Sequence, residues 1–344
     1  MLGLCLQTQH TMKNYLKIAI VVLIIGMMAS CEESNGNRKA RSVGGTREIL
    51  VVTQNPDQWD GTIGDSLRHF FLQDQYGLPQ PESRNNLAHI NAEAFSDMFK
   101  KHKCIIEVEI DPTLQQAVAK TTEDGWSAPQ RYVKISAPNT ASWVELFDKQ
   151  KEIYQQWFDK VERERILTVF RPTKDDSIAN AIAKKFGFTL VVPQGFYVAK
   201  SESDFMWLRK ELERSSADIV IYQIPYQDTL QFEPKALLSM RDLIMGQHIP
   251  GPSEGSYMGT ETEHMPPLVT TANQYPAGYA KEMRGMWKVY NNYMGGPFVS
   301  YTFADSRTGQ LVTIEGFYYE PNQKKRNPLL QLESIAYSLK FVEQ

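Results

Sequence analysis

The sequence is poor in cysteine and histidine, with three and six of them in 344 residues. Cys5 and Cys31 lie in an N-terminal segment with its own explanation, so Cys104 alone remains in the body of the chain. A single thiol cannot form an internal disulfide. Cys104 opens the apolar run 104–110, and we expect it to be a small buried hydrophobe rather than a reactive group.

Clustered positive charge is also missing. There are 37 Lys and Arg against 40 Asp and Glu, and no basic tract appears. We therefore expect no nucleic-acid partner. Glu261, Glu263 and His264 are close in sequence, but their spacing fits no zinc pattern, and a solvated acidic loop is the favoured interpretation. The sequence predicts no metal site and no cofactor.

A short apolar run near the N-terminus has the layout of a secretory signal peptide over residues 1–30. Lys13 and Lys17 precede the apolar stretch 18–28, and small residues follow it. The stretch is too short to span a bilayer, which needs about 20 helical residues. Residues 1–11 precede a better start at Met12, and we expect that the start codon is placed too early.

The segment Met28-Ala29-Ser30-Cys31 resembles the lipobox of bacterial lipoproteins. The resemblance implies cleavage before Cys31 and acylation of Cys31 by lipid, including palmitate. It also implies that the protein sits in the bacterial cell envelope, at the outer membrane, with the membrane as a partner through this anchor. Residues 31–46 are polar and rich in Gly and Ser, which predicts a flexible tether.

With 42% hydrophobic and 22% charged residues over its full length, the chain has the composition of a globular protein. For a first half over 47–165, we predict a strand at 48–52 and a helix from Ile63 to Phe71. A strand at 105–110 is expected to form a hairpin with 131–136, and Pro138-Asn139 introduces a long helix with an aromatic stripe.

For a second half over 166–344, the pattern predicts a strand at 218–224 and a helix from Pro234 to Gly246. A hairpin pairs 298–303 with 311–319, and a helix that starts at Asn327-Pro328 closes the chain. Before the strand at 218–224 we expect an inserted hairpin of 188–192 with 196–199 and a short helix at 205–209.

Each half therefore has the predicted order β-α-β-β-α, which suggests an internal duplication; the alternative is that so common an order recurs by chance. The fold class is α+β, with a largely antiparallel sheet and helices packed on one face. The pattern leaves open whether the halves form two sheets or one.

The longest segment without a predicted element, 247–297, is rich in Gly, Pro, Met and aromatic residues. With Trp207-Leu208-Arg209 and Arg241-Asp242, it makes the chain similar to an uncharacterised domain-of-unknown-function family of lipoproteins from Bacteroidota. That resemblance implies no residue roles. Long loops tend to be functional. The side chains of Tyr257, Arg284, Trp287 and Tyr293 are the candidate binding residues; alternatively, the loop's aromatic side chains are buried and pin it to the sheet.

The sequence predicts no catalytic residue. Gly251-Pro252-Ser253-Glu254-Gly255 fits G-x-S-x-G, but a helix precedes it and Pro252 removes an amide beside the serine, so a nucleophile elbow is not expected. We predict a binding or structural module that recognises an envelope protein or a glycan. The alternatives are an envelope enzyme that uses the 247–297 loop and an assembly partner of a membrane complex.

Overall fold

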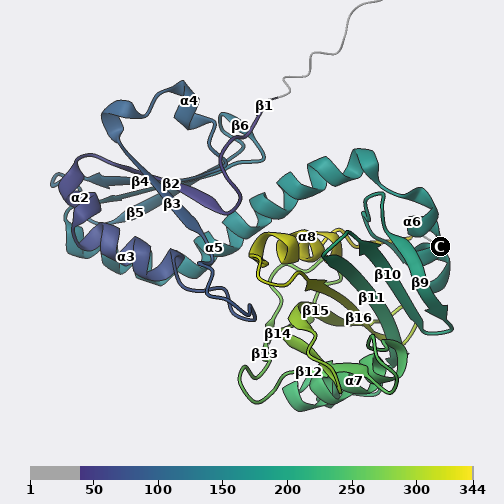
Figure 1. Cartoon of the computed structure of the whole chain (residues 1–344). Coiled ribbons are helices and arrows are strands. Elements are labelled where there is room, and N and C mark those ends of the chain that lie inside the picture. Colours follow the sequence, from purple (N-terminus) through teal and green to yellow (C-terminus); the bar gives the residue numbers. More distant parts are fainter. Residues whose placement is uncertain (1–38, 343–344) are drawn as a thin grey trace, which may run out of the picture. The chain divides into compact units, whose positions relative to one another are not determined.

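The computed structural model describes residues 39–342, and from Arg41 onward the chain forms one compact unit. The predicted signal peptide, Cys31 and the first half of the predicted tether (31–38) lie outside the described residues. Among residues 39–342, no helix combines the length and the apolar character that crossing a membrane requires. The α+β class is confirmed, because helices pack on both of the large sheets of the body (Figure 1).

The first sheet has five strands in the order β3-β2-β4-β7-β5. Its strands are β2 (Glu48–Thr53), β3 (Asn86–Asn91), β4 (Cys104–Ile110), β5 (Val118–Glu123) and β7 (Arg131–Ala137). The pairs β2/β3, β2/β4 and β4/β7 are parallel, and β5 runs antiparallel to β7. The predicted hairpin of β4 with β7 is therefore wrong, because β5 intervenes and lets β7 return in the same direction as β4.

Helices cover this sheet, and α5 is the longest of them in the described residues. They are α2 (Pro56–Asp60), α3 (Thr62–Phe71), η1 (Ala92–Ala94), α4 (Asp97–Lys100) and α5 (Thr140–Phe170). Asn139 caps α5 by accepting a hydrogen bond from the Ser142 amide at 2.9 Å. Trp143 and Phe147 from α5 pack with Phe71 from α3 in the first core, as the aromatic stripe predicts. α5 continues through residue 165, where the first half was expected to end.

The second sheet is antiparallel throughout, in the order β12-β14-β15-β16-β11-β10-β9, with β13 also paired to β14. Its strands are β9 (Tyr197–Glu202), β10 (Phe205–Glu211), β11 (Ser216–Pro225), β12 (Tyr257–Thr260), β13 (Leu268–Thr271), β14 (Ala280–Tyr290), β15 (Gly295–Asp305) and β16 (Gln310–Tyr319). The predicted hairpin of β15 with β16 is confirmed. The two sheets differ in strand order and direction, so their topology gives no support to a duplicated unit.

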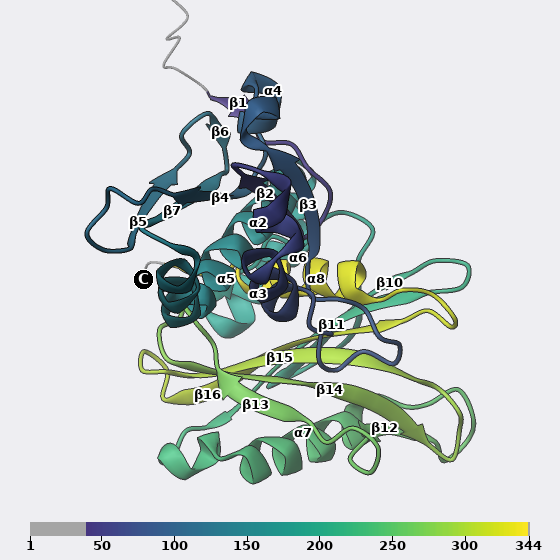
Figure 2. The same ribbon diagram turned by 90° about the vertical axis from the view of Figure 1, so that its left-hand side faces the viewer.

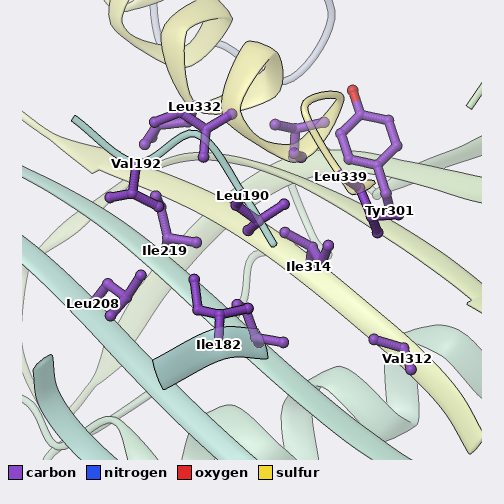
Figure 3. Close-up of a cluster of buried hydrophobic side chains, with 14 of the residues drawn as sticks. Ile182, Leu190, Val192, Leu208, Ile219, Tyr301, Val312, Ile314, Leu332 and Leu339 are labelled. Atoms are coloured by element: carbon purple, nitrogen blue, oxygen red, sulfur yellow. The ribbon is translucent and has the colours of Figure 1, made fainter. Parts of the chain in front are cut away.

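Helices lie on both faces of the second sheet rather than on one: α6 and α8 on one face, α7 on the other (Figure 2). These helices are α6 (Asp176–Phe186), α7 (Pro234–His248) and α8 (Arg326–Ala336). Successive residues of the central strands β15 and β16 are buried, so both faces of the sheet are covered. In Figure 3, Leu332 from α8 lies beside Val192 and over Ile219, within the core on the α8 face.

Three predictions between residues 188 and 297 are wrong. Residues 205–209 form strand β10 rather than a helix, and β9 pairs with β10 rather than with residues 188–192. The 247–297 segment is not one loop, since it contributes β12, β13 and β14 to the sheet. Burial alternates along most of β14, with Met283, Trp287 and Val289 inside.

The remaining elements are short. They are β1 (Ala40–Arg41), β6 (Ser127–Ala128), η2 (Arg171–Thr173), β8 (Phe188–Thr189), η3 (Thr229–Phe232) and β17 (Lys340–Phe341). β8 and β17 pair with each other, which ties the segment after α6 to the segment after α8. Cys104 is buried in the first core, as expected for a structural thiol.

Candidate binding cavity

A stripe of polar side chains runs along α5 on one face of the helix. Glu152, Gln156, Asp159 and Arg163 recur at intervals of four, three and four residues, which places them above one another. All four line a cavity of about 370 Å³. The apolar stripe of α5 faces the first core, so the helix presents this polar stripe to a different part of the molecule.

The floor of the cavity is a buried carboxylate held by three guanidinium groups. Glu333 on α8 is 3% exposed at its side chain. Its Oε1 atom lies 3.1 Å from Nη1 of Arg163 and 4.0 Å from Nη2 of Arg47, and its Oε2 atom accepts a hydrogen bond from Arg284. Burial by itself raises the pKa of Glu333, but the charges of the three arginines outweigh burial and lower it to about 2. Glu333 is therefore ionised at neutral pH.

Arg284 reaches this floor from β14 in the second sheet. Its Nε atom donates to Glu282, and its Nη2 atom donates to Glu333. The same Nη2 atom lies 3.5 Å from the hydroxyl oxygen of Tyr301. Arg284 is thus shared between two acids, and its guanidinium group is fixed in place by both.

Arg47 enters from the segment before β2 in an unusual backbone conformation. Its φ of 58° lies in the left-handed region, which costs a non-glycine residue roughly 1–2 kcal/mol. The surroundings hold it there: its amide donates to Glu162 Oε1 at 2.6 Å, and its guanidinium group donates to Asp159. Gln274, also at the cavity, has a φ of 51°. Strained residues of this kind cluster at functional sites.

The rim is polar and largely unpartnered. Within residues 39–342, the side chains of Asp74, Glu152 and Gln156 make no hydrogen bond or ion pair, although all three line the cavity. Arg84 has a loose contact, with Nη2 3.9 Å from Asp159 Oδ2. Two tyrosine rings add flat apolar surface. Tyr76 is partly exposed, and the Tyr337 ring centroid lies 3.8 Å from Cζ of Arg163.

Of the four binding residues predicted from the sequence, Arg284 alone lines this cavity. Trp287 is 3% exposed, packs in the core under α7 and donates from Nε1 to the Tyr318 carbonyl at 3.3 Å. Tyr257 is 43% exposed and lies against Tyr290, with ring centroids 5.1 Å apart. Tyr293 is fully exposed between β14 and β15. The structure does not bring the four together.

The other sequence motifs do not form a reactive centre. The Ser253 hydroxyl accepts a hydrogen bond from Asn292 at 3.3 Å, and the Ser256 hydroxyl donates to the Ser253 carbonyl. Glu261 accepts hydrogen bonds from the amides of Glu263 and His264, which lowers its pKa to about 2. The side chain of His264 is exposed beside it. In the described part of the chain, no group of three or more metal-ligating side chains converges.

Sequence reasoning missed Arg47, Asp159, Arg163 and Glu333. Two signals for them exist in the sequence. One is the helical spacing of the polar stripe on α5. The other is the position of Glu333, the one charged residue in the largely apolar run Leu329–Ala336. An acid in such a run needs a buried cation as its partner.

Family models match both parts of the body. Residues 42–171 match a domain of unknown function, DUF8532, and residues 175–338 match another, DUF4837. The chain matches two uncharacterised domain families. The DUF8532 segment supplies Arg47, Asp159 and Arg163 to the cavity, and the DUF4837 segment supplies Arg284 and Glu333. The cavity is complete only when both segments are present.

Comparisons with curated proteins and with solved structures are less informative. No curated protein matches the chain. The Ran-binding protein Mog1p of Saccharomyces cerevisiae is 11% identical, over 46% of this chain and 91% of that chain, with a TM-score of 0.27. The human StarD13 (DLC2) lipid transfer and protein localization domain is 8% identical, over 48% of this chain and 95% of that chain, with a TM-score of 0.22. These scores are too low to transfer a fold or a function.

Proposed function

We propose that this protein is a lipid-anchored binding module of a bacterial envelope that holds a polar glycan in the cavity over Glu333. The membrane part of the proposal rests on the lipobox-like segment that ends at Cys31. The binding part rests on one observation: a cavity of about 370 Å³ has an internally compensated charged floor, and the rim side chains Asp74, Glu152 and Gln156 have no partner within residues 39–342.

The size of the cavity suits a small ligand or the end of a chain, since ligand sites span about 300–1,000 Å³. Its lining is unusual because polar groups dominate it. Glu152, Gln156 and Gln274 offer planar donors and acceptors at the rim, and such groups match hydroxyl pairs on a sugar. Tyr76 adds a flat ring against which a sugar face can pack. An apolar ligand would leave these polar groups unpaired, which is costly.

The electrostatics favour binding over glycoside hydrolysis. A hydrolase of that kind needs a carboxyl group with a raised pKa that stays protonated and donates to the leaving oxygen. Glu333 has the opposite property, since the arginines hold its pKa at about 2. The guanidinium groups are likewise engaged by Glu333, Glu282 and Asp159, so they stiffen the floor.

The test is to identify what the cavity carries. The full chain is purified from the envelopes of cells that produce it, then denatured, and the released compounds are identified by mass spectrometry. The variants Gln156→Trp and Thr270→Trp fill the rim from α5 and from β13. Lys149→Trp, exposed elsewhere on α5, is the control.

We expect the wild type and Lys149→Trp to release the same glycan and the two filled variants to release much less of it. If all four proteins release the same compounds in equal amount, the cavity is not the binding site. Circular dichroism melting checks that each variant remains folded.

A further inference from the structure

A second cavity lies on the α8 face of the second sheet and shares no lining residue with the first. Its volume is about 460 Å³. It is enclosed by the end of α5, the segment before β9, the β10–β11 hairpin, β16 and α8. We propose that this cavity binds the chain of one free fatty acid, with the carboxylate of the fatty acid held by Lys210.

The inner wall is apolar and buried. Leu332 and Ile335 from α8 line it together with Phe196, and each is less than a tenth exposed. The outer lip is apolar as well but open to solvent, since Val169 is 64% and Leu212 is 63% exposed. Large aliphatic side chains gathered around an opening mark a surface that gains free energy when an apolar group covers it.

Lys210 gives the lining of the cavity a positive charge. It is the one charged side chain in the lining, where the other polar groups are neutral Thr, Gln, Ser and Tyr side chains. Within residues 39–342, Lys210 makes no hydrogen bond and no ion pair, whereas nearby Lys200 lies 2.9 Å from Glu202. An ammonium group without a partner beside an apolar cavity is complementary to an anionic head on an apolar chain. A carboxylate provides a charge-assisted hydrogen bond there.

The volume limits the length of the chain. A dry protein cavity of ~150 Å³ holds one benzene molecule, or six carbon atoms. By the same ratio, about 460 Å³ accommodates roughly eighteen carbon atoms. One long fatty acid fits this estimate, and a diacyl phospholipid, with two such chains, does not. The proposal is independent of the glycan cavity, since the two sites have different walls.

The experiment uses a palmitate analogue with a diazirine in its chain and an alkyne at its end. It is added to isolated membranes that contain the full chain and is activated by light, and labelled peptides are located by mass spectrometry. Unlabelled palmitate competes in one arm and hexadecanol, which lacks the charge, in another. The variants are Lys210→Glu and Leu212→Glu. Lys235→Glu and Leu243→Glu, on α7 away from the cavity, are the matched controls.

We expect label on peptides from 169–173, 193–217 and 318–336, which hold the lining residues, displaced by palmitate and much less by hexadecanol. Lys210→Glu should lower the apparent affinity roughly tenfold or more, which corresponds to at least about 1.4 kcal/mol. Leu212→Glu should lower it as well, and both controls should match the wild type. The proposal is overturned if hexadecanol competes as well as palmitate, if Lys210→Glu labels like Lys235→Glu, or if the label falls outside these peptides.

Discussion

Arg163 and Glu333 join α5 to α8 through an ion pair of 3.1 Å that is almost completely buried. Arg163 comes from the DUF8532 segment and Glu333 from the DUF4837 segment. Arg47 reaches the same carboxylate from the segment before β2, and Arg284 reaches it from β14. One side chain thus fixes how four separate parts of the body meet.

Replacing Glu333 should be severely destabilising. Glu333→Gln leaves three buried guanidinium groups without their central carboxylate, and breaking a buried pair in this way costs about 3–5 kcal/mol. Urea denaturation at pH 7 measures the loss in the free energy of unfolding. Glu145→Gln, an exposed change on α5, is the control and should stay within about 0.5 kcal/mol of the wild type.

The effect of Glu333→Gln should also depend on pH. The folded-state pKa of Glu333, about 2, lies below its ordinary value of 4.5. Its ionised form therefore stabilises the fold above pH 4.5, and this stabilisation is lost as the pH falls from 4.5 through 2. The difference between wild type and variant should shrink across that window. A difference that is constant from pH 7 to pH 3 would contradict this account of the floor.

Asp218→Asn should stabilise the protein at neutral pH. Burial raises the pKa of Asp218 from 3.8 to about 6, although Arg209 and a hydrogen bond from Trp207 favour its charged form. A raised pKa means that stability is lost as the pH rises from 3.8 through 6. At pH 8 the free energy of unfolding of the variant should exceed that of the wild type by up to about 3 kcal/mol, because each pKa unit corresponds to about 1.4 kcal/mol.

Thermal melting at pH 8 and pH 4 tests this, because the gain should vanish at pH 4, where the wild-type carboxyl is protonated. Trp207 Nε1 donates to Asp218 Oδ1 at 2.8 Å, and asparagine keeps that acceptor. Asp148→Asn, on the exposed face of α5, should show no such gain. Equal melting temperatures of Asp218→Asn and the wild type at pH 8 would show that the buried charge of Asp218 does not destabilise the protein.

Trp287→Ala and Tyr293→Ala separate packing from recognition in the 247–297 segment. Trp287 is buried under α7, so its removal should cost about 3–5 kcal/mol in the free energy of unfolding. Tyr293 is fully exposed, and its removal should leave the melting temperature unchanged. Scanning calorimetry compares the two. If Tyr293→Ala also melts early, the turn between β14 and β15 has a structural role.

Cys31→Ser tests the proposed anchor. Lipidation needs the thiol, so metabolic labelling with a palmitate analogue should mark the parent protein and not the variant. Both proteins are recovered by the same C-terminal tag, and loading is compared by immunoblot. Equal labelling of the two would show that Cys31 is not the site of acylation.

Local signals were sufficient for much of the fold. Asn139 and Pro234 mark helix starts correctly because capping and first-turn preferences act within one turn. The hairpin of β15 and β16 was predictable for the same reason. β14 was missed because Gly285 occupies a buried position of the strand without an apolar side chain, which weakens the alternating pattern in the sequence.

The cavity had a weaker signature. Arg284 was named from the composition of its segment, whereas Asp159 and Arg163 belong to a polar stripe of a helix. Spacing alone cannot tell whether such a stripe faces water or another element. Arg47 and Glu333 pair across most of the chain, and no local pattern records a contact between residues so far apart.

That distance along the chain has a consequence for biosynthesis. Arg47, Arg163 and Arg284 are all translated before Glu333, and α8 also supplies Leu332 and Ile335 to the core on the α8 face of the second sheet. A nascent chain that has emerged as far as β16 holds three cations without their acid and a sheet without one of its covering helices. Chains with such exposed surface are targets for chaperones. The body can close only after α8 has left the ribosome or crossed the membrane.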